Sequence, residues 1–263
     1  MKRILQAFVT ALSLFLAAGS AQAALIDRGG GLIYDTALNI TWLQNANLAA
    51  GTIYDNGWSP TDGNMSFANA SLWAANLSYF DSVNGVTYSG WRLPRGLDFG
   101  APGAPAGPSG SGPGCDYTHN GSDCGTNSDP MSSELVHLFY SDLGNLGQYT
   151  TDGILRPGVS GIDWGLVNSG PFININIDSS DPDMIFWSSV VNSVDASDGW
   201  RHFHFSTGRM TTAGLNEQSN YWRAWAVRDG DIASISAVPV PGAYALLLAG
   251  LGLLGFVGRR RKH

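Results

Sequence analysis

The chain has 263 residues, two cysteines and a formal net charge of −7. Six of its 14 Lys and Arg residues lie in the first three or the last five positions, so the middle part has eight Arg, no Lys and all 21 acidic residues. Nucleic acids and anionic membrane surfaces bind cationic patches, and this balance of −13 argues against both as partners. A middle part of about two hundred residues is long enough for one domain with a sizeable core.

Residues 1–23 have the three parts of a secretory signal peptide. Two basic residues are followed by an apolar run over residues 4–18 and by a small-x-small cleavage site formed by Ala21 and Ala23. We expect cleavage after Ala23 and export of the remaining chain. An uncleaved N-terminal anchor is the alternative, but the apolar run is short for a membrane span.

The predicted domain, residues 24–230, begins with strands followed by helices. Leu25–Asp27 and Leu32–Asp35 flank three glycines and predict a β-hairpin, and residues 39–43 predict another strand. Helical periodicity occurs over residues 65–77 and again over residues 132–143. The positions expected to face inward are Phe67, Ala70, Trp73, Ala74, Leu77, Leu135, Phe139 and Leu143.

A stretch rich in Gly, Pro and Ser occupies residues 99–130. Because loops of this length are unusual inside a compact domain, we interpret the stretch as a surface insertion. It contains Cys115 and Cys124, the two cysteines of the chain. In an oxidising compartment we expect them to close a ten-residue loop as a disulfide, since a metal site made of two cysteines alone is the less favoured alternative.

The C-terminal half is predicted to be rich in β-structure. Strands are expected over residues 172–177, 185–189, 200–205 and 221–228. In the first of these, isoleucines alternate with asparagines as in a half-buried strand. Strands at both ends of the domain with two helices between them predict a single α+β domain.

The tail, residues 238–263, follows a short linker over residues 231–237 and has three parts. A proline motif precedes an uncharged apolar run over residues 243–257, and a basic cluster ends the chain. Fifteen helical residues span roughly 22 Å, and the proline motif and snorkelling arginines close most of the gap to a hydrocarbon core of about 30 Å. We predict a transmembrane helix in the inner membrane with the basic cluster on its cytoplasmic side; a buried core helix is the alternative.

This tail resembles the PEP-CTERM sorting signal of Gram-negative bacteria. The residues that carry the resemblance are Val238, Pro239, Pro241, Gly242, Arg259, Arg260 and Arg261. The resemblance implies recognition by an exosortase, an integral membrane cysteine peptidase that removes the tail and passes the protein to the envelope or extracellular matrix. Val240 stands where the family usually has Glu, a departure that bears on cleavage rather than on anchoring.

The middle part resembles a second family, the Lcl C-terminal-type domain of unknown function. Its motifs occur in order at residues 90–94, 133–135, 186–189 and 223–228. The resemblance implies a C-type-lectin-like α+β fold related to formylglycine-generating domains. Phe186, in place of the usual Tyr, and the long insertion depart from the family pattern.

These motifs also have a purely structural interpretation, which we favour over ligand contact. Trp187 and Trp225 are predicted to lie in the core, because large aromatic side chains usually mark packing. Arg92 is expected to donate a fork of hydrogen bonds that fixes its loop. Ser188 and Ser189 are expected to bond backbone groups.

Few residues suggest a catalytic or metal-binding role. His202 and His204 lie two apart on a predicted strand, a spacing that can bind zinc with Glu134 or His137 as a third ligand, although an exposed polar strand face is the commoner explanation. Oxygen ligands for calcium are offered by Asp178, Asp181 and Asp183, with an ordinary turn as the alternative. The sequence contains no P-loop, H-E-x-x-H or G-x-S-x-G motif.

The leading prediction is therefore a non-enzymatic envelope or extracellular-matrix protein that binds a glycan, such as an envelope polysaccharide, or another surface protein. A calcium-assisted carbohydrate-binding module is one alternative. The other is an enzyme related to the formylglycine-generating fold, whose chemistry needs a reactive, metal-coordinating cysteine pair.

Overall fold

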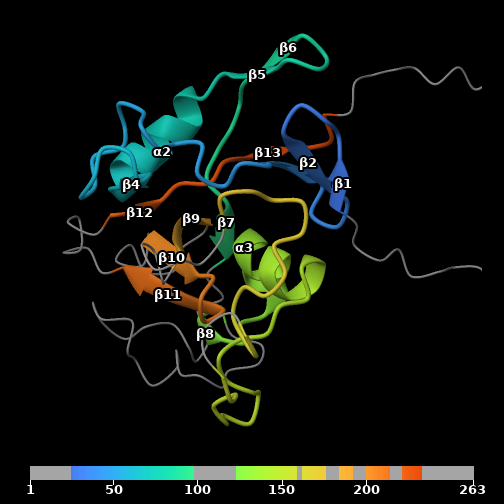
Figure 1. Ribbon diagram of the computed structural model, residues 1–263, viewed down its shortest axis with the longest axis vertical. Helices are drawn as coiled ribbons and strands as arrows, with labels where there is room; N and C mark the ends of the chain where they lie inside the picture. The colour runs from blue at the N-terminus through green and yellow to red at the C-terminus, as the bar shows by residue number, and fades with distance from the viewer. Residues whose placement is uncertain are drawn as a thin grey trace, which may run out of the picture. The chain divides into compact units, whose positions relative to one another are not determined.

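The computed structural model describes residues 25–97, 123–158, 162–175, 184–191, 200–213 and 221–232. The chain divides into two units, Met1–Ile232 and Ala233–His263, and all described residues lie in the first unit. Its elements are mostly strands with two short α-helices (Figure 1). The predicted α+β class is confirmed.

The smaller of the two main sheets begins with the predicted hairpin. It has the strand order β1-β2-β3-β13 and all its pairs are antiparallel. The hairpin turn requires glycine, because Gly30 has a φ of 61° and a Cβ added there would overlap the Asp81 carboxylate. The four strands are Leu25–Asp27 (β1), Leu32–Asp35 (β2), Ile40–Leu43 (β3) and Val227–Asp229 (β13).

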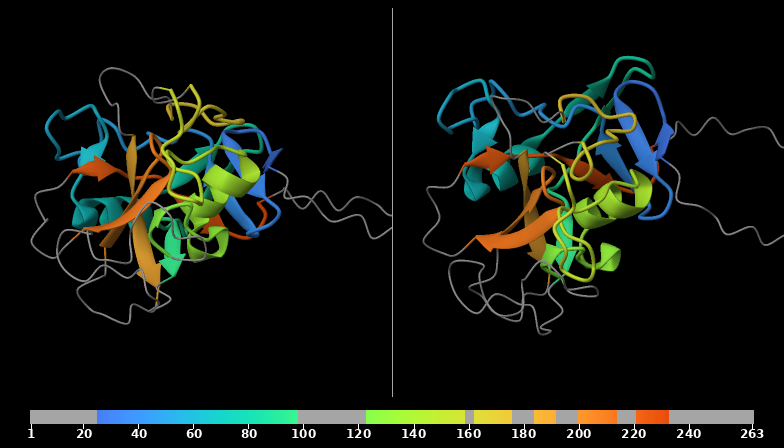
Figure 2. Two further views of the ribbon diagram at one scale, coloured as in Figure 1. Left: turned by 90° about the horizontal axis from the view of Figure 1, so that it is seen from below. Right: turned by 60° about the horizontal axis from the view of Figure 1, so that its bottom comes forward.

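The larger sheet has seven strands, and Figure 2 shows it from two further sides. Six of them follow the order β4-β12-β9-β10-β11-β8, and the seventh, β7, pairs with β9. The pairs β12–β9 and β7–β9 are parallel, and the other pairs are antiparallel. The strands are Asn64–Met65 (β4), Arg95–Leu97 (β7), Gly125–Thr126 (β8), Ile185–Val191 (β9), Trp200–His204 (β10), Arg209–Ala213 (β11) and Trp222–Arg223 (β12). The predictions at residues 185–189 and 200–205 are confirmed, whereas β11 was not predicted.

The first predicted helix is present, and beside it in sequence lies a small hairpin. Helix α2 covers Phe67–Asn76, so it begins two residues later and ends one residue earlier than predicted. Ser66 caps it by accepting a hydrogen bond from the Asn69 backbone N–H at 3.3 Å. Its inward face is as predicted, with Ala70, Trp73 and Ala74 buried. The hairpin is formed by Tyr79–Asp81 (β5) and Val86–Tyr88 (β6).

The second predicted helix is divided into three short pieces. Pro130–Ser132 (η1) is a 3₁₀ turn, Glu134–His137 (α3) is α-helical and Leu138–Asp142 (η2) is a π-helix. The first division occurs at Ser133, which is extended and accepts a hydrogen bond from the Leu135 N–H. In the π turn, the Leu143 N–H bonds the Leu138 carbonyl five residues earlier. The predicted inward residues of this segment are nevertheless buried, namely Leu135, Phe139 and Leu143.

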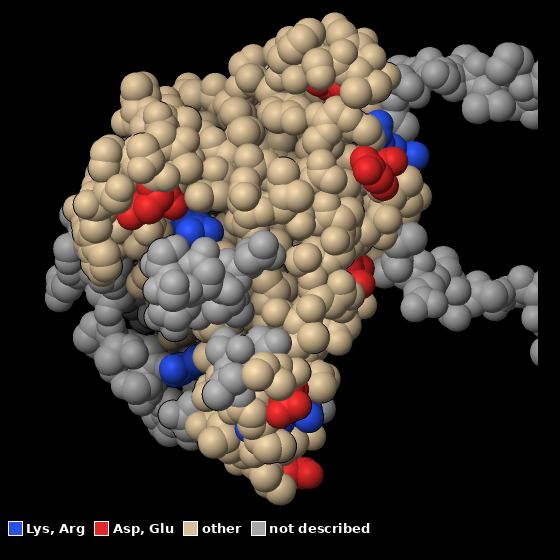
Figure 3. Space-filling model, viewed as in Figure 1, with Lys and Arg blue, Asp and Glu red and all other residues tan. Residues whose placement is uncertain are grey.

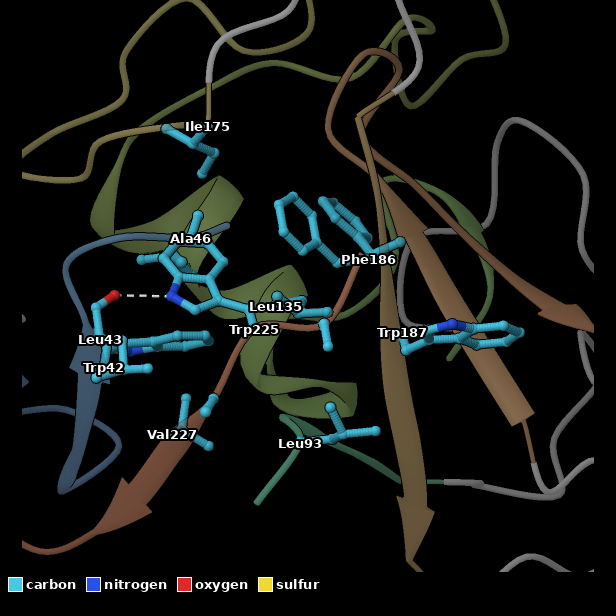
Figure 4. Close-up of a cluster of buried hydrophobic side chains, with 14 of the residues drawn as sticks. Trp42, Leu43, Ala46, Leu93, Leu135, Ile175, Phe186, Trp187, Trp225 and Val227 are labelled. Carbon is cyan, nitrogen blue, oxygen red and sulfur yellow. Dashed lines mark hydrogen bonds between the residues drawn. The ribbon is translucent and has the colours of Figure 1, made fainter. Parts of the chain in front are cut away.

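Trp225 lies at the centre of the core cluster shown in Figure 4. Its ring centroid is 5.0 Å from that of Trp42 and 4.9 Å from that of Phe172, and its Nε1 donates to the Leu43 carbonyl at 2.7 Å. Trp225 belongs to the segment 224–226, which connects β12 in the larger sheet to β13 in the smaller one. The prediction of one continuous strand over residues 221–228 is therefore wrong, because this segment passes between two sheets and is buried on all sides.

The predicted strand over residues 172–177 is also wrong in its described part. Residues 172–175 make a single isolated bridge, between Ile173 and Asn45. Asn174 has a φ of 57°, which ends any extended run, and its side chain donates to the Asn45 side chain at 2.9 Å. Ile173 is consequently 52% exposed, while Phe172 and Ile175 are buried.

The C-terminal end of the predicted insertion 99–130 lies in the interior rather than at the surface. Residues 98–122, including Cys115, lie outside the described residues. Asp123 and Cys124 are fully buried, and β8 pairs with β11. The Asp123 carboxylate and carbonyl accept hydrogen bonds from the buried Arg201 guanidinium at 3.1 and 2.8 Å, because a buried cation needs such partners. The predicted disulfide stays a prediction.

Candidate functional site

Several predicted site residues lie outside the described part of the chain. They are the signal cleavage residues Ala21 and Ala23, the acidic residues Asp178, Asp181 and Asp183, and the sorting residues Val238, Pro239, Pro241, Gly242, Arg259, Arg260 and Arg261. The predicted transmembrane helix over residues 243–257 lies there too. Within the described ranges, no helix has the length and apolar character needed to cross a membrane.

Charged side chains on the face shown in Figure 3 form small, separate groups on a mostly uncharged surface. Among all described residues, on whichever face they lie, the best-connected group of charged side chains is centred on Arg92, whose backbone pairs with Val227. Its guanidinium donates two hydrogen bonds of 2.7 Å to the Glu134 carboxylate, and its Nε donates to Asp229 at 3.0 Å. These bonds hold the pKa of the Asp229 carboxyl below its ordinary value. The predicted fork of hydrogen bonds from Arg92 is confirmed.

A pocket of about 180 Å³ lies beside this group. It is lined mainly by apolar atoms, with Arg95 and Glu134 as its charged residues. Typical small-molecule sites occupy roughly 300–1,000 Å³. Both carboxylate oxygens of Glu134 already accept hydrogen bonds, from the Arg92 guanidinium and, at 2.7 Å, from the Arg95 backbone N–H. We therefore assign this region to the scaffold.

The predicted histidine pair lies on β10. The His202 and His204 rings are 5.0 Å apart, and the Trp222 ring lies 3.7 Å from that of His202. Burial, together with the nearby Arg209, lowers the pKa of His204 to about 4, and burial also lowers the pKa of His202 well below its usual value. His202 is 5% exposed, so the pair is not an exposed polar face. Neither histidine belongs to the group of three potential ligands that the described residues bring together.

That group is formed by Asp35, His137 and Asp142. Asp35 ends β2, His137 ends α3 and Asp142 ends η2. One potential ligand atom from each lies within 4.8 Å of the others. Asp35 is fully buried, as is the side chain of Asp142, whereas the His137 side chain is 13% exposed.

The three side chains influence one another electrostatically. Burial raises the pKa of Asp35, against the hydrogen bond from the Leu38 N–H, and the nearby Asp142 raises it further. Asp142, whose Oδ1 lies 3.5 Å from His137 Nε2, raises the pKa of the imidazole against the opposing effect of burial. Two carboxyl groups and an imidazole held within 4.8 Å of one another make this the strongest candidate for a ligand site in the described structure.

Sequence reasoning missed this group for a physical reason. Asp35 lies 102 residues before His137, in a different predicted element. His137 and Asp142 are five residues apart, a spacing that an α-helix would place on different faces. The π turn brings His137 and Asp142 together, and no pattern in the sequence predicts that turn.

Comparison with known proteins identifies the tail. Residues 237–262 match the PEP-CTERM protein-sorting motif, and the match spans Val240. No curated protein and no solved structure matches the chain. The C-terminal motif predicted from the sequence is confirmed, and it implies an exported cell-surface protein that is processed by an exosortase.

Proposed function

We propose that the protein is a non-enzymatic component of the envelope or extracellular matrix. Its predicted domain, residues 24–230, here called the body, binds a surface glycan after an exosortase has removed the tail. The observation that carries the proposal is the sorting motif at residues 237–262. In this proposal the body has a C-type-lectin-like fold, and a disulfide between Cys115 and Cys124 stabilises it outside the cytoplasm.

The sorting step is tested by comparing the full chain with a version that ends at Ala237. We expect the full chain in the envelope or surface matrix and the truncated chain as soluble exported protein, because the truncation removes the motif, the apolar run and the basic cluster. Cell fractionation and immunoblotting measure the two distributions. Identical distributions would refute the sorting step.

An exposed aromatic side chain supports glycan binding. Trp58, in the loop between β3 and β4, is 83% exposed, and its ring lies edge-on to Tyr221 at 6.5 Å. The loop is held by the buried Asp55 carboxylate, which accepts hydrogen bonds from the Gly51 and Gly63 N–H groups, both at 2.9 Å. An exposed indole on a fixed loop offers a flat apolar face with a polar edge, and the faces of sugar rings pack on such a surface.

The binding step is tested with Trp58→Ala. We expect about a tenfold loss of affinity for envelope polysaccharide, or ~1.4 kcal/mol, measured by affinity electrophoresis of the purified protein. Stability should change little, because the side chain is outside the core. Phe80→Ala is the matched control, since Phe80 is a 61% exposed aromatic on β5. Equal mobility shifts for both variants would exclude Trp58 as a contact.

A further inference from the structure

The group formed by Asp35, His137 and Asp142 has buried polar atoms that make no hydrogen bond with the described residues. Both carboxylate oxygens of Asp142 and both ring nitrogens of His137 are buried and make no hydrogen bond. Buried polar groups in folded proteins are almost always hydrogen-bonded, and a buried carboxylate without a partner costs several kcal/mol. A neutral imidazole has one acceptor nitrogen, so a single partner placed between the two side chains would meet that nitrogen and a carboxylate oxygen together.

A protonated His137 does not meet this requirement. A charge-assisted N–H···O bond is about 2.7–2.9 Å long, whereas His137 Nε2 and Asp142 Oδ1 are 3.5 Å apart, too far for such a bond. One imidazolium would also supply a single positive charge to two buried carboxyl groups, and Asp35 is compensated only by hydrogen bonds from the Ala37 and Leu38 N–H groups and, at 3.5 Å, from Trp42 Nε1. A divalent cation bound to two carboxylates and a neutral imidazole gives a neutral site.

The spacing suits a metal ion. Zinc–nitrogen and zinc–oxygen bonds of about 2.1 Å place neighbouring ligands of a tetrahedron ~3.4 Å apart, close to the 3.5 Å between His137 Nε2 and Asp142 Oδ1. Asp35 is already oriented, because its Oδ1 accepts hydrogen bonds from the Ala37 and Leu38 N–H groups at 2.9 and 3.0 Å. Such outer bonds typically hold ligating carboxylates in place.

We propose that Asp35, His137 and Asp142 bind one divalent first-row transition-metal ion, of which Zn²⁺ is the test ion. An imidazole nitrogen beside two carboxylates suits this class, whereas Ca²⁺ takes oxygen ligands only. The ion connects the end of β2 to the π-helix η2. Because all three side chains are mostly or fully buried, its role is structural.

The experiment uses the full chain, purified in detergent without a polyhistidine tag and stripped with EDTA. After exposure to Zn²⁺ and gel filtration, elemental analysis should find one Zn²⁺ retained per chain, and the melting temperature should rise. Ca²⁺ at the same concentration should produce neither effect. Absence of retained Zn²⁺ in the folded wild-type protein overturns the proposal.

Variants of single residues test which side chains bind the ion. Asp142→Asn and His137→Gln should each lower Zn²⁺ affinity at least tenfold, since each removes a ligand. Asp152→Asn, in an exposed turn, and His204→Gln, on β10, are matched controls that should keep wild-type affinity. If a ligand variant does not fold, substitution of Co²⁺ in the wild-type protein decides the question. A visible spectrum of four-coordinate Co²⁺ with nitrogen and oxygen ligands supports the site, and the spectrum of hexaaqua Co²⁺ excludes it.

Discussion

At the scale of single residues, the motif residues singled out in the sequence act as parts of the scaffold. Trp187 Nε1 donates to the Met65 carbonyl at 2.7 Å and thereby bonds β9 to β4. The Ser188 and Ser189 hydroxyls both donate to the Pro94 carbonyl, at 3.1 and 3.3 Å. These bonds join segments about ninety to 120 residues apart, so the ordered motifs mark points where distant parts of the chain meet.

The Arg92 group gives the residue-scale prediction. Glu134→Gln should lower the free energy of unfolding by about 1–3 kcal/mol, because it leaves a partly buried guanidinium with fewer charged partners. The Arg92 and Glu134 side chains are 18% and 15% exposed. Urea unfolding, followed by tryptophan fluorescence, provides the measurement.

The matched control for this prediction is Asp231→Asn. Asp231 pairs with Arg28 in a more exposed position, with side chains 31% and 26% exposed. An exposed pair contributes less than about 1 kcal/mol, so the control should shift the urea midpoint less. A control effect equal to that of Glu134→Gln would contradict the role assigned to burial.

At the scale of elements, strand β10 gives a prediction on pH. The folded-state pKa of His204 is about 4, below the value of about 6.5 for an unfolded histidine. Between these values the unfolded state binds more protons, so the free energy of unfolding falls as pH falls from about 6.5 to 4. The loss due to His204 alone should reach ~3 kcal/mol at pH 4, and His202 acts in the same direction.

Urea unfolding of the wild type and of His204→Gln at several pH values between 7 and 4 tests this prediction. The free energy of unfolding should depend on pH less steeply in the variant than in the wild type, by up to ~1.4 kcal/mol per pH unit. Asp229, whose pKa is lowered, loses its own contribution from about pH 5 downward, but it is present in both proteins and so cancels in the comparison. An unchanged slope in the variant would place the pH dependence elsewhere.

Elements that follow from local chemistry were predictable, whereas those set by tertiary contacts were not. The β1–β2 hairpin follows from three glycines between apolar runs, and the inward face of α2 follows from helical periodicity. The regular alternation over residues 172–177 is interrupted by the left-handed backbone of Asn174. The segment 221–228 contains β12, which belongs to the larger sheet, and the start of β13, which belongs to the smaller one. A local sequence pattern cannot predict such a change of sheet.

The candidate site follows the same division. The histidine pair on β10 was visible in the sequence because alternate residues of a strand share a face. Its environment was not visible, because Trp222 reaches His202 through a different strand. The group of Asp35, His137 and Asp142 depends on a π turn and on the packing of that turn against the end of β2, both of which are tertiary properties.

At the scale of the whole molecule, a predicted signal peptide precedes a body of acidic composition, and the sorting motif follows it. The sorting motif at residues 237–262 defines the route of the protein. The proposed binding residue, Trp58, and the proposed metal ligands lie in that body and belong to different segments. Sorting, glycan binding and metal binding can therefore be removed one at a time.

The buried segment 224–226 has a mechanical consequence for the protein while its C-terminal tail is still attached. Tension applied through the tail enters the body immediately after β13. From there it passes to β3 through backbone hydrogen bonds and to the interior through the indole of Trp225, which is bonded to Leu43. The strand nearest the tail thus follows a fully buried segment, so a pull on the tail is resisted by the core.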